Sequence, residues 1–69
     1  MAEPITSKQL GILHFIARNP NVGRATLVAS KGATDLDLAY LAQHDMIRER
    51  EPGCFHVSHF GDMVLKRSL

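Results

Sequence analysis

Cysteine and histidine side chains, which zinc prefers as ligands, fall close together near the C-terminal end of the sequence as Cys54, His56 and His59. Their spacing is not that of a zinc finger. In a strand, Cys54 and His56 would point to the same side and His59 would lie in the next element, so a shared site would need the chain to fold back. Cys54 also has no neighbouring run of cations to activate its thiol. We therefore expect no metal, redox site or cofactor.

Carboxylate pairs are the other groups that could do chemistry, and they do not indicate an enzyme. Asp35 and Asp37 lie two residues apart in a predicted helix, so their side chains point in different directions. The sequence has no glycine-rich phosphate loop and no hydrolase nucleophile motif. A chain of 69 residues is also short for enclosing a substrate pocket. We expect no catalytic activity.

The length and composition indicate one globular domain. A chain of 69 residues allows a single domain, residues 1–69, with a core at about residues 5–67. A hydrophobic content of 45% argues against disorder. A single cysteine cannot form an intramolecular disulfide, and no apolar run reaches the length of a signal peptide or a membrane span. These features predict a cytoplasmic protein without membrane contact.

Charge is distributed unevenly although the formal net charge is only +1. Residues 34–47 contain Asp35, Asp37 and Asp45 but no lysine or arginine. The segments on either side carry an excess of cations over acids. An acidic segment between two basic ones attracts a polyanion at its flanks and repels it at its centre.

The N-terminal half predicts two helices. Thr6 and Gln9 form a capping box that starts the first helix, and Asn19-Pro20 ends it. The second helix runs from about Arg24 to Lys31, and Gly32 supplies its left-handed end. The residues expected to face the core are Leu10, Leu13, Ile16 and Ala17 in the first helix, and Leu27 and Val28 in the second.

The C-terminal half predicts a helix, a hairpin and a last helix. Thr34 caps a helix with Leu38, Leu41 and Ala42 inside, and Asp45 takes a left-handed exit. Residues 47–51 and 54–57 are strands that turn at Pro52-Gly53, and residues 21–23 can pair with them as a short third strand. Ser58 caps a last helix that carries Phe60, Met63, Val64 and Leu65.

This order of elements resembles the winged helix-turn-helix family of DNA-binding domains, and small bacterial regulators of the MarR and ArsR kinds in particular. Leu27-Val28 and Gly32 look like the family's second helix and turn, and Pro52-Gly53 looks like the tip of its wing. The other matching segments are Leu38, Leu41, Met46 and Ile47 at the end of the recognition helix, and Val57-Ser58-His59-Phe60-Gly61 at the start of the last helix, with Asp45 where the family usually has glycine. The resemblance covers roughly residues 5–67. It implies a mainly α fold with a small β-hairpin: a three-helix core, a wing and a short C-terminal helix.

The resemblance also implies that the chain is a small transcriptional regulator that binds duplex DNA sequence-specifically. The helix after Thr34 would enter the major groove with Leu36, Asp37, Tyr40, Gln43 and His44 outward, and the wing would touch the backbone. Gln43 can read adenine, and strand alternation would place Arg48 and Arg50 on one face of the wing. The DNA-binding candidates are Arg24, Lys31, Thr34, Asp37, Tyr40, Gln43, His44, Arg48 and Arg50. A homodimer through Phe15 and Phe60 is expected, although both could be core residues.

The acidic centre keeps a second interpretation open. Leu36 and Tyr40 lie one turn apart on the predicted outer face, and an exposed Leu–Tyr pair can anchor a protein partner. On this alternative the domain docks on transcription or replication machinery, or on another regulator. The two interpretations differ in salt dependence, because phosphate contacts weaken steeply with salt and an apolar interface does not.

Overall fold

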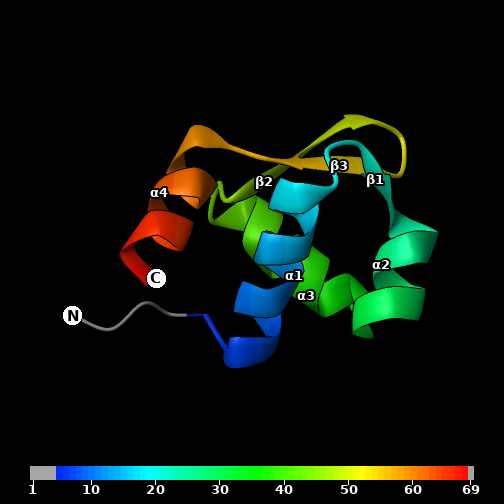
Figure 1. The fold of residues 1–69 in the computed structure, drawn as a ribbon. Coiled ribbons are helices and arrows are strands. Elements are labelled where there is room, and N and C mark those ends of the chain that lie inside the picture. The colour runs from blue at the N-terminus through cyan, green and yellow to red at the C-terminus, as the bar shows by residue number, and fades with distance from the viewer. Residues whose placement is uncertain (1–4, 69) are drawn as a thin grey trace.

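The computed structural model describes residues 5–68, in which four helices pack against a three-stranded antiparallel sheet (Figure 1). The elements in chain order are α1 (Ser7–Arg18), β1 (Val22–Gly23), α2 (Arg24–Lys31), α3 (Asp35–Gln43), β2 (Ile47–Glu51), β3 (Cys54–Val57) and α4 (His59–Ser68). The strand order is β1-β3-β2. The sheet runs along one side of the helices, with α2 and α4 near its two ends (Figure 1). None of the helices in residues 5–68 combines the length and apolarity that a membrane crossing requires.

The helix ends form where the sequence predicts them, because each depends on nearby residues. The Gln9 backbone N–H donates to Thr6 Oγ1 at 3.0 Å, and the Thr6 N–H donates to Gln9 Oε1 at 3.1 Å. This capping box satisfies backbone donors that the first turn of α1 leaves unpaired. Gly32 ends α2 with a φ of 64°, and Asp45 turns the chain after α3 with a φ of 59°. The predicted boundaries are thus confirmed.

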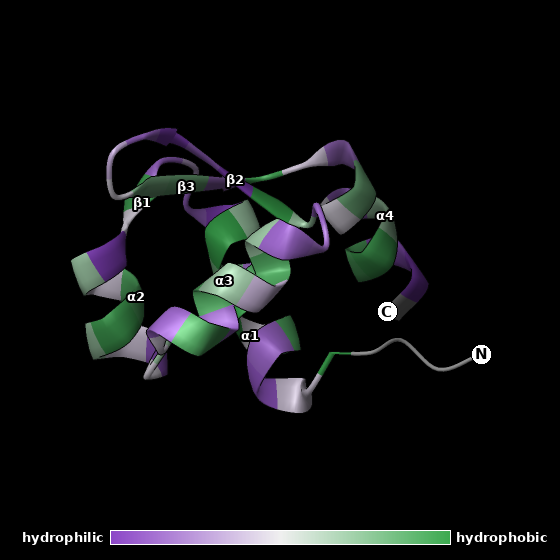
Figure 2. Ribbon diagram, turned by 180° about the vertical axis from the view of Figure 1, so that it is seen from behind, coloured by the Kyte–Doolittle hydropathy of each residue, from purple (hydrophilic) through white to green (hydrophobic). Residues whose placement is uncertain are grey.

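The hydrophobic core lies between the helices and the inner face of the sheet. Its fully buried side chains come from the four helices, from β2 and from the residue before β2. They are Ile12, Leu13, Ile16, Leu27, Leu38, Leu41, Met46, Ile47 and Val64. Phe55 of β3 closes the core from the sheet side. Figure 2 shows the opposite face of the molecule, where α3 lies and the hydrophilic loop of the β2–β3 hairpin extends beyond it. A core that draws on every element makes their arrangement interdependent.

Three residues that the helical pattern assigns to the core are exposed instead. They are Ala17, Val28 and Ala42, and Val28 is 48% exposed. Each directly follows a buried residue in its helix, so it lies about 100° further round the axis, at the edge of the buried arc. In so small a core that edge has no neighbouring element to cover it. Phe60 and Met63 of α4 are likewise 41% and 44% exposed, whereas Val64 and Leu65 are buried.

Ser58 forms hydrogen bonds both to the segment that follows α3 and to the first turn of α4. Its hydroxyl is buried, donates to the Asp45 carbonyl and accepts the Gly61 N–H at 3.0 Å. The Ser58 N–H donates to the Met46 carbonyl at 3.0 Å. Ser58 therefore acts as the predicted N-terminal cap of the last helix and also pins the chain segment that leaves α3.

Gly61 occupies a position that tolerates no side chain. A Cβ there would lie 2.1 Å from the Met46 carbonyl oxygen and 2.9 Å from Val57 Cγ1. The first of these atoms belongs to the backbone, so the contact cannot be relieved by a rotamer change. Gly11 of α1 contrasts with it, because a Cβ at that position would meet nothing within 4 Å.

We predict opposite effects of alanine at these two glycines. Gly61→Ala should lower the free energy of unfolding by about 2–3 kcal/mol, because the overpacked backbone must move. Gly11→Ala should raise it by about 0.5–1 kcal/mol, since alanine favours the helix. Urea unfolding followed by circular dichroism measures both. A Gly61→Ala variant as stable as the parent chain would contradict the close approach of α4 to Met46.

Candidate nucleic-acid interface

The outward face of α3 carries an uncharged stripe of four residues. Leu38 and Leu41 point into the core, and the opposite side of the helix presents Leu36, Ala39, Tyr40 and Gln43. Leu36 is 82% exposed, Ala39 and Gln43 are exposed, and Tyr40 is half-buried. We call these four residues the α3 stripe. Ala39 is the member that the sequence analysis missed, because a small side chain gives no signal of its own.

His44 extends the α3 stripe at the C-terminal end of the helix. It is exposed, and its ring centroid lies 4.2 Å from that of Tyr40, with the two planes tilted by 38°. The two rings therefore lie in contact at a tilt. Leu36, Tyr40, Gln43 and His44 therefore lie on the side of the helix on which the sequence placed them, whereas Asp37 does not.

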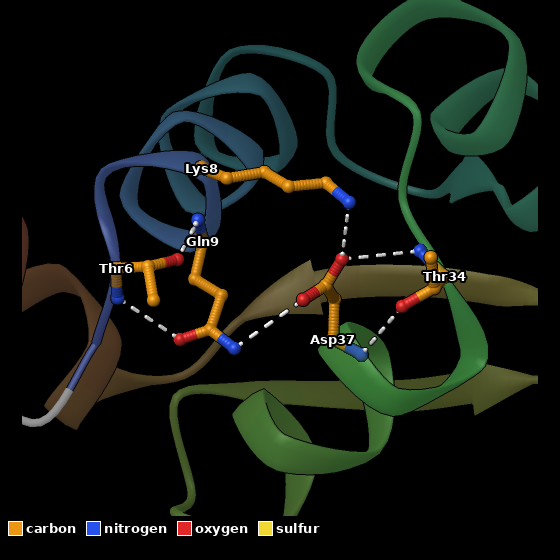
Figure 3. Close-up of polar contacts among 5 residues, drawn as sticks. All are labelled: Thr6, Lys8, Gln9, Thr34 and Asp37. Atoms are coloured by element: carbon orange, nitrogen blue, oxygen red, sulfur yellow. Dashed lines mark hydrogen bonds and ion pairs between the residues drawn. The ribbon is translucent and has the colours of Figure 1, made fainter.

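Asp37 points to α1 rather than outward, so its predicted place on the outer face is wrong (Figure 3). Lys8 Nζ lies 3.0 Å from Asp37 Oδ2, and Gln9 Nε2 donates to Asp37 Oδ1 at 3.3 Å. The Thr34 N–H donates to the same carboxylate at 3.2 Å, while the Asp37 N–H donates to Thr34 Oγ1 at 3.1 Å. The physical reason is rotation, because Asp37 stands about 100° from Leu36 and faces the start of α1.

The contacts of Asp37 keep its carboxylate charged. The Lys8 ammonium, followed by the N–H and hydroxyl of Thr34 and the Gln9 amide, lowers the pKa of Asp37 from 3.8 to about 2, against the opposing effect of burial. Its side chain is only 14% exposed. The ion pair therefore links α3 to α1. The hydroxyl of Thr34 accepts the Asp37 N–H and so caps α3.

The other two acids of the acidic segment are also paired. Arg24 Nη1 lies 2.6 Å from Asp35 Oδ1, and the same guanidinium lies 5.5 Å from the centroid of the Phe55 ring. Arg48 Nη2 lies 3.0 Å from Asp45 Oδ1. Every acid of the segment thus pairs with a cation, Asp35 and Asp37 with cations of other helices and Asp45 with the nearby Arg48. The negative centre that the sequence indicates is compensated locally.

The β2–β3 hairpin, the predicted wing, is anchored beside α2. The Arg24 N–H donates to the carbonyl of Gly53, which turns the hairpin with a φ of 82°, at 2.8 Å. Glu49 pairs with Phe55 and Glu51 with Cys54, so Arg50 is an extra residue in a β-bulge. The bulge interrupts the alternation on which the predicted common face of Arg48 and Arg50 depended.

The cations around α3 differ in their availability. Arg48 and Arg50 are both exposed, and Arg50 forms no ion pair within the part of the chain that the structure describes. Lys31, at the end of α2, has its ammonium 5.7 Å from the centroid of the Phe15 ring, and Phe15 itself packs against the core. Arg50 is therefore the cation on this side with the least internal compensation.

A hollow of about 530 Å³ separates α3 from the wing. Leu38, Ala39 and Ala42 line it from α3, and Glu49 and Phe55 line it from the wing. Arg24 and Asp35 complete its rim as an ion pair. Ala39 belongs to both the α3 stripe and this lining, so the stripe borders the hollow on the side of the wing. Within residues 5–68, no three histidine, cysteine or acidic side chains gather closely enough to hold a metal ion.

We predict a pH-dependent contribution of Asp37 to stability. Because folding lowers its pKa from 3.8 to about 2, the contribution is complete above pH about 4 and is lost as the pH falls to about 2. Asp37→Asn should therefore be less stable than the parent chain at pH 6, and the gap should close near pH 2. Urea unfolding across this range measures the gap. Glu51→Gln, which removes an exposed carboxylate, should show no such convergence; a constant gap for Asp37→Asn would contradict the assignment.

Comparison with known proteins identifies the architecture. No protein-family model matches the sequence, and no curated protein matches it. A solved structure with a similar fold is that of a multiple antibiotic-resistance repressor (MarR) from Listeria monocytogenes 4b F2365, with a TM-score of 0.86 and 20% sequence identity. The match covers 94% of this chain and 50% of that one, so this chain spans half the length of the repressor. Residues 5–68 therefore have the winged helix-turn-helix fold seen in a MarR repressor.

Proposed function

We propose that this domain binds duplex DNA sequence-specifically, as the DNA-binding part of a small transcriptional regulator. In this proposal α3 enters the major groove and the wing lies against the backbone. The observation that carries it is the α3 stripe, which projects opposite the core and beside the wing in a fold shared with a repressor. An α-helix with its side chains fits the width of the major groove.

The pairing of the acids weakens the repulsion that the acidic segment is expected to exert on DNA. Asp35, Asp37 and Asp45 lie near α3, and each pairs with a cation, which lowers the repulsion between these acids and a polyanion. Arg50 remains available for phosphate. The exposed Arg48–Asp45 pair is weak in water, so Arg48 can exchange its partner for a phosphate. Lys31 and Arg24 flank α2 and complete the predicted backbone contacts.

Asp37 no longer belongs among the base-reading candidates. Its carboxylate fixes α3 on α1 and is largely shielded from solvent. Thr34 is exposed at the N-terminus of α3 and can approach the backbone, although its hydroxyl already caps the helix. Tyr40, Gln43 and His44 keep their proposed roles at the groove.

We extend the proposal to a homodimer in which α4 contacts a second copy. Phe60 and Met63 are about one turn apart on α4 and are both substantially exposed. Phe15 is not part of this surface, since it packs against the core. Figure 1 places α4 at the end of the sheet away from the hairpin turn, so contact through α4 leaves α3 and the wing free. Such a dimer would present two recognition helices to a two-fold site.

A second candidate function is a protein-binding winged helix. The observation that favours it is the 82% exposure of Leu36 next to Tyr40 on the outer face of α3, since exposed apolar surface can mark a protein contact. Leu36 with Tyr40 could seat in a groove on the transcription or replication machinery, or on another regulator. The salt dependence of binding distinguishes this candidate from the first.

We predict that binding to a mixed-sequence duplex weakens log-linearly with salt. Arg50→Ala should reduce the slope of log K against log salt by about 0.9, the effect of losing one phosphate contact, and Arg48→Ala should also reduce it. Fluorescence anisotropy from low to moderate salt measures the slope. Lys66→Ala is the matched control, because Lys66 pairs with Asp62 on α4, away from the wing. The absence of binding at low salt would refute the proposal for the isolated chain and turn attention to the protein-binding candidate.

For the dimer, we predict that replacing Phe60 and Met63 together by serine shifts the chain from dimer to monomer in sedimentation equilibrium. The substitution removes apolar surface that only a partner copy would cover. Val28→Ser, which alters an equally exposed side chain on α2, should leave the association unchanged. A parent chain that sediments as a monomer at high concentration would exclude the α4 dimer.

A further inference from the structure

The α3 stripe lacks the groups that read a G·C base pair. Guanine is recognised chiefly by arginine or lysine bonding to its O6 and N7 atoms, and α3 contains neither residue. Cytosine is recognised by a carboxylate that accepts from its N4 amino group. The two carboxylates of α3, Asp35 and Asp37, lie on its flanks and are each bound by a cation. The stripe itself therefore carries neither an arginine or lysine for guanine nor a carboxylate for cytosine.

The same stripe carries the groups that read an A·T base pair. Apolar side chains contact the 5-methyl group of thymine, and a glutamine amide bonds to N6 and N7 of adenine. Leu36 and Ala39 provide exposed hydrocarbon, and Gln43 provides an exposed amide on the same side of the helix. The chemistry of the exposed side chains is thus biased towards one kind of base pair.

The spacing of these groups suits a short run of base pairs. Leu36 and Gln43 are seven residues apart, which corresponds to about 10 Å along the helix axis. Base pairs are stacked about 3.4 Å apart, so the stripe spans about three of them. Leu36 stands at the N-terminal end of α3, the part of a recognition helix that contacts base edges in helix-turn-helix proteins. Its 82% exposed side chain gains most from being covered.

We infer that α3 reads a short A·T stretch, with Leu36 as the specificity-determining residue against thymine methyl groups and Gln43 against adenine. This inference rests on the proposed binding of duplex DNA. Because thymine and uracil differ in the major groove only by the 5-methyl group, the contact of Leu36 can be tested by one chemical change in the DNA.

The experiment compares three duplexes of about 20 base pairs, two helical turns. The first is an alternating A·T duplex, in which thymine and adenine follow one another along both strands. The second is the same duplex with deoxyuridine in place of thymidine. The third is an alternating G·C duplex. Anisotropy titrations at one low salt concentration give the dissociation constants. The parent chain should bind the thymine duplex more tightly than the uracil duplex, by about fourfold for each methyl group covered. It should bind the G·C duplex more weakly than the thymine duplex.

Leu36→Ala should reduce the difference between the thymine and uracil duplexes, because Ala39 remains, and it should leave the salt slope of binding unchanged. The variant keeps the core intact, because Leu36 is 82% exposed, and alanine favours the helix. Val28→Ala removes an exposed apolar side chain from α2 and should preserve the thymine preference. Gln43→Ala should narrow the difference between the A·T and G·C duplexes.

The possible outcomes distinguish a failure of the A·T inference from a failure of the proposed DNA binding. Salt-dependent binding that is equal for the thymine and uracil duplexes overturns the role of Leu36 and leaves DNA binding standing. A thymine preference that is equally large in Leu36→Ala and in the parent chain also overturns that role. The absence of binding to all three duplexes refutes DNA binding and the inference together.

Discussion

The burial of Leu38 and Leu41 and the hydrogen bonds and ion pair of Asp37 together fix the rotation of α3 about its own axis. One carboxylate joins the N-terminus of α3 to Lys8 and Gln9 of α1, while the backbone of the same residue completes the cap with Thr34. Directing Asp37 to α1 places Leu38 in the core and Leu36 in solvent, because the three positions are separated by fixed steps round the helix. The composition of the α3 stripe, and therefore every proposal for what it contacts, follows from this rotation.

Charge compensation across the fold makes an acidic segment compatible with the proposed nucleic-acid interface. The cations that balance Asp35 and Asp37 come from α2 and α1, far from them in sequence. In the sequence these acids stand close together, whereas in the folded chain each is paired with a cation. The surface beside the wing is consequently closer to neutral than the sequence indicates, and its discrimination would depend on shape, methyl groups and amides more than on charge.

The sequence predicts local features well because they depend on residues a few positions apart. The cap at Thr6, the left-handed turns at Gly32 and Asp45, and both hairpin strands were predictable for this reason. The direction of Asp37 was not, because the Gln9 amide that bonds it lies 28 residues earlier. Nor was the bulge at Arg50, which depends on the register with β3. Contact between the candidate residues and DNA involves a second molecule, so the sequence of this chain alone does not determine it.

The bulge at Arg50 also has a consequence for the behaviour of the protein in concentrated solution. β2 is an outer strand of the sheet, with one row of backbone groups that lacks a neighbouring strand. A flat outer strand is a template on which another chain can add its own strand, the first step of aggregation. In β2 the register shift and the run from Arg48 to Glu51 oppose such addition, while β1, the other outer strand, is only two residues long. The irregularity that displaces one arginine thus protects the sheet from uncontrolled growth.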